Sequence, residues 1–259
     1  MMDARIQRYA DLLYEAERDK IAVEPLTLTD PSLTVDDAYA VQLCNVTRLT
    51  EKGQRISGKK IGLTSPGIQK QLGINEPDYG HLFENMDCPD GRIETDALLL
   101  PKIEAEIAFI LKRDLTGENV TAEDVKNAAD CVAASFEIVD SRIKDWRINL
   151  ADTVADNASS GRYVLGNKRL PLDATDLSRV TMQLYKNGQL VEEGRGDAVL
   201  GDPCISVAWL ANKLHRYGVV LKKGEVILSG AFTAAAPAAK GDVFEARFSD
   251  FGNIRAEFI

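Results

Sequence analysis

From residue 54 onward the chain breaks into short β-forming runs separated by Gly, Asp and Asn, and this limits the fold more than any other feature. Lys186-Asn-Gly-Gln189 carries the Asn-Gly signal of a tight hairpin, and Asp250-Phe-Gly-Asn253 is a looser version. A doubly wound parallel sheet needs a helix after most strands, so we expect a β-rich α+β domain. The expected strands are 60–63, 103–111, 131–139, 162–165, 180–186, 225–228, 243–248 and 254–259, with helices at 121–129 and 205–217.

The residues before this β-rich part are expected to be helical. Residues 3–18 place their apolar side chains on one stripe at helical spacing. A Pro-containing connector follows, and Thr34 with Asp37 forms the capping-box pattern that begins a second helix. We therefore divide the chain into a helical N-terminal region, residues 1–53, and a β-rich domain, residues 54–259.

The composition of the 259-residue chain is that of a globular protein, with 45% hydrophobic and 27% charged residues. Its net charge is −9 and no Lys/Arg-rich run occurs, which argues against nucleic-acid binding and against binding to an anionic membrane. No apolar run approaches the roughly 20 residues that span a bilayer, and charges interrupt the N-terminal segment, so we expect no membrane segment or signal peptide. The four cysteines lie far apart, which indicates free thiols and a cytoplasmic protein.

Two glutamates lie two residues apart in the expected strand 103–111. Side chains in a strand alternate between faces, so Glu104 and Glu106 project from the same face. The flanking Ile107 and Phe109 indicate that one side of the strand is buried, and two buried carboxylates repel each other unless a cation lies between them. A half-exposed strand with two surface glutamates would explain the same pattern.

A third carboxylate, Glu137, is embedded in the apolar strand 131–139. Taken alone, it could form a buried ion pair with Arg142. Together with Glu104 and Glu106 it makes three carboxylates on two buried strands, which is the number and type of ligand that Mg²⁺ or Mn²⁺ prefers. The chain has only two histidines, so any metal must be held by oxygen ligands.

Three further segments carry polar groups beside the expected strands. Lys60 opens the strand 60–63, where it would bind a substrate carboxylate or transfer a proton if it points inward, and would be a surface lysine otherwise. The segment 76–80, which contains Asp78, is typical of a turn. Residues 152–161 are rich in small polar side chains, which is typical of a loop that lines a site or closes a turn. No nucleotide-binding or hydrolase-triad motif occurs.

Six motifs occur in a characteristic order along the chain, and together they resemble one family. The set is similar to the 2-keto-4-pentenoate hydratase family of the fumarylacetoacetate hydrolase superfamily, which also includes 4-oxalocrotonate decarboxylases and 2-oxohept-4-ene-1,7-dioate hydratases. The resemblance extends from about residue 34 to the end of the chain. The motifs are Lys60-Ile-Gly-Leu-Thr-Ser65, Glu76-Pro-Asp-Tyr-Gly80, Ile103-Glu-Ala-Glu-Ile-Ala-Phe109, Glu137-Ile-Val-Asp-Ser-Arg142, Ala155-Asp-Asn-Ala-Ser-Ser-Gly161 and Val207-Ala-Trp-Leu-Ala-Asn212.

The resemblance implies a mixed β-roll core of the fumarylacetoacetate hydrolase type with a small helical N-terminal region. It also implies a homo-oligomer, a small 2-oxo or 2-hydroxy-dienoic acid as substrate and Mg²⁺ or Mn²⁺ as cofactor. The family's functional positions map to Glu104, Glu106 and Glu137 for the metal and to Lys60, Asp78 and Ser160 for catalysis.

The activity implied by the resemblance is the addition of water to 2-hydroxypenta-2,4-dienoate (2-oxopent-4-enoate) to give 4-hydroxy-2-oxopentanoate, in aromatic meta-cleavage catabolism. The metal would chelate the C1 carboxylate and the C2 oxygen, and the dienol would ketonise. Water would then add at C4, with Lys60 and Asp78 as candidate proton-transfer groups. A complex with a neighbouring pathway enzyme is a further expectation, because hydratase and decarboxylase paralogues associate.

Two other functions stay open on the sequence. A 4-oxalocrotonate decarboxylase would use the same metal site to stabilise the charge left by loss of CO₂. Asp78 favours the hydratase, whereas Thr233-Ala-Ala235 resembles the decarboxylases. A non-catalytic acid-binding subunit is the third possibility, although all three glutamates and Lys60 are retained.

Two local features concern specificity and the site's rim. The loop 230–237 has no basic residue, which predicts a preference for the short monoacid over longer dicarboxylates. Asp202 stands where relatives commonly have a histidine, and this difference is expected to alter either the start of the following helix or the rim of the pocket.

Overall fold

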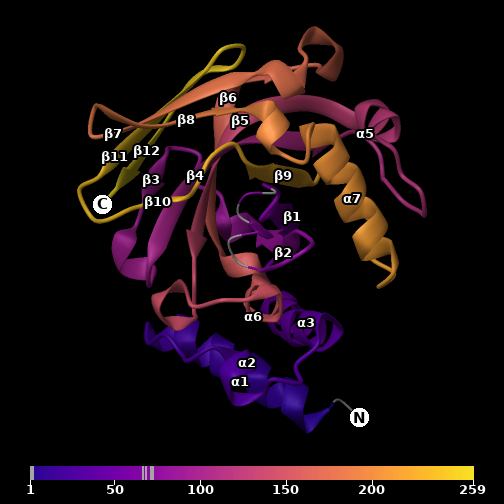
Figure 1. Cartoon of the computed structure of the whole chain (residues 1–259), viewed down its shortest axis with the longest axis vertical. Coiled ribbons are helices and arrows are strands. Elements are labelled where there is room, and N and C mark those ends of the chain that lie inside the picture. Colours follow the sequence, from indigo (N-terminus) through magenta and orange to yellow (C-terminus); the bar gives the residue numbers. More distant parts are fainter. Residues whose placement is uncertain (1–2, 66, 68, 71–72) are drawn as a thin grey trace.

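The computed structural model describes residues 3–65, 67, 69–70 and 73–259, in which two mixed β-sheets pack beside a group of helices (Figure 1). The strands of the larger sheet are β1 (Ile56–Gly62), β2 (Asp78–Phe83), β4 (Pro101–Leu111), β5 (Ala129–Asp140), β6 (Ser160–Leu170), β9 (Val226–Ala231) and β10 (Ala236–Pro237). They run in the order β2-β1-β9-β4-β5-β6, with β10 added to β4. β1 and β9 are parallel and the other pairs are antiparallel, so the sheet is mixed.

The strands of the smaller sheet are β3 (Arg92–Ile93), β7 (Thr181–Lys186), β8 (Gln189–Arg195), β11 (Val243–Phe248) and β12 (Gly252–Phe258), in the order β3-β12-β11-β7-β8. Both predicted hairpins are present, joining β7 to β8 and β11 to β12. In the first, Asn187 and Gly188 have φ angles of 52° and 80°, the left-handed conformation that a two-residue hairpin turn requires. The expected α+β fold is confirmed.

Six α-helices complete the described chain: α1 (Ala4–Asp19), α2 (Leu26–Thr29), α3 (Val35–Glu51), α5 (Ala122–Ala128), α6 (Leu150–Ala155) and α7 (Pro203–His215). The capping box of Thr34 and Asp37 begins α3, as predicted. In Figure 1, α1, α2 and α3 lie together at the bottom with α6, while α7 lies beside β9. Apolar side chains of α1 and α3 belong to the same continuous core as those of β4 and β5, so the division at residue 53 stays a prediction.

Two segments differ from the secondary structure expected for them. Asp78, Tyr79 and Gly80 were expected in a turn but form the start of β2, which pairs with β1 and is buried along its whole length. Within the expected loop 152–161, four residues belong to α6, whose capping box is formed by Asn149. In both cases tertiary packing outweighed the local preference of small polar residues for turns.

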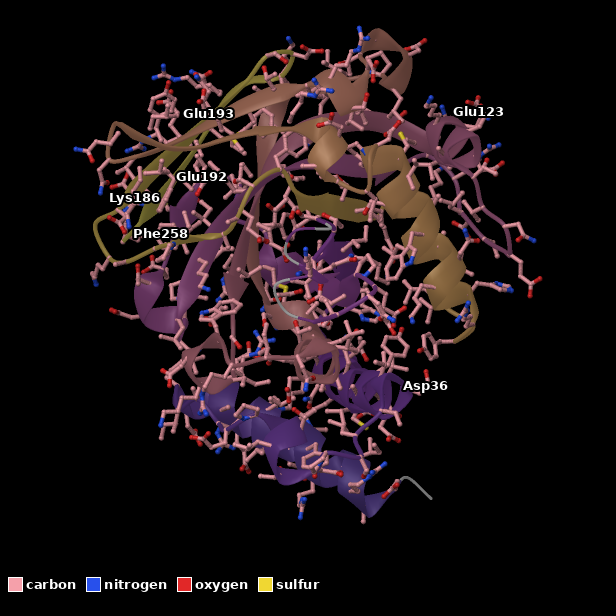
Figure 2. The ribbon with its side chains drawn as sticks, viewed as in Figure 1. Asp36, Glu123, Lys186, Glu192, Glu193 and Phe258 are labelled. Atoms are coloured by element: carbon pink, nitrogen blue, oxygen red, sulfur yellow. The ribbon has the colours of Figure 1, made fainter. Side chains whose placement is uncertain are left out.

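The centre of the fold is the pair β4 and β5, which is buried on both faces over most of its length. Charged side chains such as Glu123 and Glu193 lie on the outside of the molecule (Figure 2). Among the described residues, no helix has the length and apolar character needed to cross a membrane.

Burial of His81 in β2 makes the stability of the fold depend on pH. Its side chain is 3% exposed, and its Nδ1 lies 2.9 Å from Gln42 Oε1. Burial, reinforced by nearby Lys59, lowers the pKa of His81 to about 3 from an ordinary value of 6.5. Between these two values the unfolded chain binds a proton that the folded protein does not, so the free energy of unfolding falls as the pH drops below 6.5.

We expect this residue to cost about 1.4 kcal/mol of stability for each pH unit below 6.5. Urea unfolding at several pH values down to roughly pH 5 measures the slope. In His81→Gln, the fall in the free energy of unfolding that is due to His81 should disappear. His215 is partly exposed, so His215→Gln should keep this pH dependence. An identical slope in His81→Gln and the unsubstituted protein would contradict the assignment.

Candidate active site

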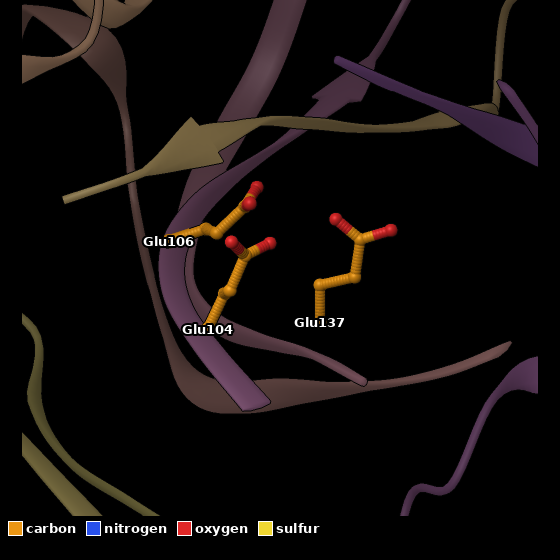
Figure 3. A group of neighbouring side chains, drawn as sticks. All are labelled: Glu104, Glu106 and Glu137. Atoms are coloured by element: carbon orange, nitrogen blue, oxygen red, sulfur yellow. The ribbon is translucent and has the colours of Figure 1, made fainter. Parts of the chain in front are cut away.

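Three glutamates meet on one face of β4 and β5 (Figure 3). Glu104 and Glu106 project from the same face of β4, as the strand period predicts. The antiparallel register places Glu137 of β5 directly opposite Glu104, and Ser135 opposite Glu106. One carboxylate oxygen from each glutamate lies within 4.8 Å of the others. Figure 3 shows the three carboxylates converging on a common space.

Hydrogen bonds and ion pairs from the rest of the protein offset the negative charge of these three carboxylates only in part. Glu106 and Glu137 are fully buried, and Glu106 Oε2 accepts a hydrogen bond of 2.9 Å from the Gly230 N–H. Glu106 Oε1 and both oxygens of Glu137 accept no hydrogen bond from the residues that the structure describes. Burial raises the pKa of Glu137 to about 8 despite nearby Lys60, and it raises the pKa of Glu106 well above its usual range, helped by repulsion from Glu137 and Glu104. Such a cluster is costly unless a cation is bound.

The donor set fits a hard divalent cation. It consists of carboxylate oxygens alone, and three of these are buried without a hydrogen-bond partner in the described part of the chain. Magnesium and manganese prefer such oxygen ligands and leave further positions for water or substrate. Arg142, the alternative partner for Glu137, is instead paired with Asp156, its Nε lying 2.6 Å from Asp156 Oδ1. The metal-ligand assignment of the three glutamates stays a prediction that this geometry supports.

Lys60 and Asp78 lie beside the three glutamates. The pairing of β1 with β2 aligns Lys60 with Gly80, and Lys60 Nζ lies 3.3 Å from Glu137 Oε1 and 3.9 Å from Asp78 Oδ1. Lys60 is 2% exposed, so it points inward and is not a surface lysine. Burial alone would lower the pKa of Lys60, but attraction to Glu137 and Asp78 outweighs burial and raises it, which keeps the ammonium protonated.

One oxygen of Asp78 is held and the other is free. Asp78 Oδ2 accepts a hydrogen bond of 2.6 Å from Thr153 Oγ1, whereas Oδ1 has no hydrogen-bond partner among the described residues. Gly62 leaves room for this arrangement, because a Cβ at that position would lie 2.4 Å from Asp78 Oδ1 and 3.0 Å from Lys60 Nζ. A fixed carboxylate with one free oxygen is suited to accepting a proton.

Lys60, Asp78 and Glu104 line a cavity of about 240 Å³, whereas Glu106 and Glu137 lie behind its lining. Much of the cavity lining is apolar and is formed by residues such as Val139, Ile148 and Ala234. Several lining residues have left-handed backbone conformations, which are strained for side chains other than glycine. They are Leu63, Trp146, Ala158 and Ser159, with φ angles of 56°, 55°, 49° and 53°. Strain of this kind is typical of functional sites, where the surrounding structure holds the backbone in place.

Ser160 is not among the residues that line this cavity. Its Oγ donates a hydrogen bond of 2.8 Å to the Asn157 carbonyl oxygen, and it lines a smaller pocket near α1 and α3. Its neighbour Ser159 lines the cavity instead. The catalytic role of Ser160 stays a prediction, and its position gives that role no support.

Sequence reasoning did not single out three residues of the site: Thr153, Trp146 and Lys102. Thr153 lies on α6, in a segment expected to be a loop, and Trp146 follows a loop that carries no motif. Lys102 was a detectable candidate, because it lies two residues before Glu104 and therefore on the same face of the strand. Asp202 lies outside the cavity and accepts a hydrogen bond of 2.7 Å from the Cys204 N–H, capping α7.

Comparisons with known proteins agree with this fold and site. Residues 86–259 match the fumarylacetoacetate (FAA) hydrolase C-terminal family. A 2-hydroxyhexa-2,4-dienoate hydratase of Comamonas testosteroni is 46% identical over 98% of this chain and 97% of its own length. A 2-keto-4-pentenoate hydratase of Paraburkholderia xenovorans is 47% identical, over 96% of this chain and 93% of that protein.

A solved structure is also closely similar. The 4-oxalocrotonate decarboxylase of Pseudomonas putida, complexed with magnesium and adipate, superposes with a TM-score of 0.96 at 37% identity, over 100% of this chain and 99% of that one. Fold, site and relatives together define an enzyme of the fumarylacetoacetate hydrolase superfamily. Within that superfamily the chain belongs to the 2-keto-4-pentenoate hydratase family, which confirms the resemblance carried by its motifs.

Proposed function

We propose that this protein is a divalent-metal-dependent hydratase. It converts 2-hydroxypenta-2,4-dienoate and water to 4-hydroxy-2-oxopentanoate in the catabolism of aromatic compounds by meta-cleavage. The observation that carries the proposal is the cluster of Glu104, Glu106 and Glu137, whose charge Lys60 offsets only in part. Glu104 of this cluster lines one cavity together with Lys60 and Asp78. The hydratase relatives, which match nearly the whole chain, support the same activity.

The metal is proposed to be Mg²⁺ or Mn²⁺, held by the three glutamates. Related structures contain magnesium, calcium or manganese, which supports a divalent ion in general. When bound, such an ion supplies Lewis-acid polarisation of the substrate's carboxylate and 2-oxygen. The all-carboxylate donor set favours these hard ions over softer metals.

Asp78 and Lys60 are proposed to divide the proton transfers. The dienol proton leaves the 2-oxygen and a proton is added at C5, which gives an α,β-unsaturated ketone. Water then adds at C4 while a proton reaches C3. Asp78 accepts the proton of the water through its free Oδ1, and the Lys60 ammonium is positioned to donate one. Thr153 holds Asp78 in place through Oδ2, and the apolar part of the cavity lining is suited to contact with the carbon chain of the substrate.

Decarboxylation of 4-oxalocrotonate is the second candidate function. It is favoured by the 37% identity and TM-score of 0.96 with the decarboxylase structure. The hydratase is preferred because Asp78 has a free oxygen for activating water, which loss of CO₂ does not require.

Assembly and location are also proposals. The edge strand β8 exposes Leu190 and Val191, at 47% and 41%, which supports a homo-oligomer that covers them, or a complex with a neighbouring pathway enzyme. None of the four cysteines forms a disulfide in the described structure, which is compatible with a cytoplasmic enzyme.

The test is to offer the purified, Mg²⁺-loaded protein 2-hydroxypenta-2,4-dienoate and 4-oxalocrotonate in separate assays. We expect the dienoate absorbance to disappear with formation of 4-hydroxy-2-oxopentanoate, and a chelator to abolish the reaction. Release of CO₂ from 4-oxalocrotonate, with no hydration of the five-carbon acid, would establish the decarboxylase instead. If neither product forms, the non-catalytic subunit becomes the better description.

A further inference from the structure

Lys102 is a cation on the wall of the catalytic cavity that no carboxylate neutralises. It lies on β4, on the same face as Glu104, and both line the cavity. Its Nζ lies 4.2 Å from the centre of the Trp146 ring. Within the described part of the chain, no acidic residue forms an ion pair with it, although Glu104 attracts it from a greater distance.

The Trp146 ring holds the Lys102 ammonium without neutralising it. Trp146 Nε1 donates a hydrogen bond of 3.1 Å to the Leu100 carbonyl oxygen, and its backbone is in the left-handed region at φ 55°. The ring is therefore fixed by a bond to the residue that precedes β4. A cation over an aromatic face keeps its charge and its hydrogen-bond donors available for an anion.

The formal charges of the site call for a second cation. With a divalent ion bound, the three glutamates and Asp78 would carry four negative charges, and Lys60 together with that ion would balance only three of them. An anionic substrate would then enter a cavity that is already negative, which opposes its binding. Lys102 restores neutrality before the substrate arrives.

We propose that Lys102 is a substrate-binding residue that donates a hydrogen bond to the C1 carboxylate of the 2-hydroxydienoate. This inference rests on the proposed function, in which that carboxylate lies at the metal site formed in part by Glu104. Lys102 lies two residues before Glu104, so both side chains project from the same face of β4. The Lys102 ammonium can therefore reach a carboxylate that is bound next to Glu104. The carbon chain of the substrate then lies along the apolar wall that includes Val139 and Ala235.

Lys102 also changes what the loop 230–237 implies about specificity. That loop has no basic residue, and Arg142, Lys144 and Arg162, which lie elsewhere in the chain, are not among the described residues that line the cavity. Lys102 is paired in register with Pro237, so it lies beside this loop. A distal carboxylate of a longer diacid is therefore the rival ligand for Lys102, and the experiment has to separate it from C1.

The experiment compares Lys102→Met with Lys144→Met, a control on an exposed lysine near Trp146 that pairs with Glu24. Calorimetry measures binding of 2-oxopentanoate, a saturated acid that cannot be hydrated, to each Mn²⁺-loaded protein. We expect affinity to fall about tenfold or more in Lys102→Met and to stay unchanged in Lys144→Met. Affinity for Mn²⁺ itself should be unchanged in both, and Lys102→Arg should recover part of the loss.

Kinetics then decide which carboxylate Lys102 binds. For hydration of the five-carbon monoacid, KM should rise in Lys102→Met by about the same factor as for a longer dicarboxylic dienoate, with a smaller change in kcat. A loss confined to the diacid would overturn the C1 assignment, and unchanged binding of 2-oxopentanoate or a loss of Mn²⁺ affinity would overturn it as well. If the unsubstituted protein binds 2-oxopentanoate through Lys102 but hydrates nothing, the proposed function fails while this inference stands.

Discussion

Glu106→Gln should abolish divalent-metal binding and hydration, yet leave the metal-free protein as stable as before or more stable. Glu106 is fully buried, and its carboxylate is repelled by Glu137 and Glu104, which together with burial raises its pKa well above the usual range. The amide has nearly the same shape, and its oxygen still accepts the hydrogen bond from the Gly230 N–H. The neutral amide therefore avoids the cost of burying or protonating this carboxylate when no metal is bound, and it removes a ligand when a metal is present.

Metal affinity should fall by more than the roughly 10–100-fold that changes in outer-shell partners typically cost. Isothermal titration with Mn²⁺ and urea unfolding in a chelator measure the two effects separately. The matched control is Glu225→Gln, because Glu225 is also buried but pairs with Lys59, whose Nζ lies 2.8 Å from its Oε1. Breaking that pair should destabilise the fold by about 3–5 kcal/mol and leave metal affinity unchanged. A marked loss of stability in Glu106→Gln, with Mn²⁺ still bound, would refute the metal site.

Asp78→Asn should lower the rate of hydration by about 10²–10⁴-fold while leaving metal affinity nearly unchanged. Asp78 is outside the group of three glutamates, and its proposed task is to accept a proton through Oδ1. The asparagine oxygen can still accept the hydrogen bond from Thr153 Oγ1, so the local structure should persist.

The measurements are kcat for the five-carbon acid and an Mn²⁺ titration of the same preparation. The exposed Asp173→Asn serves as a control for loss of a carboxylate remote from the cavity. If Asp78→Asn hydrates within a few-fold of the unsubstituted protein, Asp78 is not the proton acceptor. The preference for hydratase over decarboxylase would then lose its main support in the chain's own residues.

The sequence by itself determined the features that depend on near neighbours. Strand parity placed Glu104 and Glu106 on one face, and the apolar residues around Glu137 indicated its burial. The Asn-Gly pair at 187–188 predicted a hairpin because few residues tolerate the left-handed backbone of that turn. Six ordered motifs were enough to identify the family.

Only the tertiary structure decided which distant residues share the site. The register of β4 against β5 sets Glu137 opposite Glu104, and a slip of one residue would turn it to the other face. The local sequence around Asp78 favours a turn, but pairing with β1 places this residue in a buried strand. As a result, Asp78 Oδ1 lies 3.9 Å from Lys60 Nζ. Tertiary packing also decided that Ser159, and not Ser160, lines the cavity. It likewise placed the Lys102 ammonium over the Trp146 ring. Propensity and periodicity act within a few residues along the chain, whereas these contacts depend on register and on packing between segments far apart in sequence.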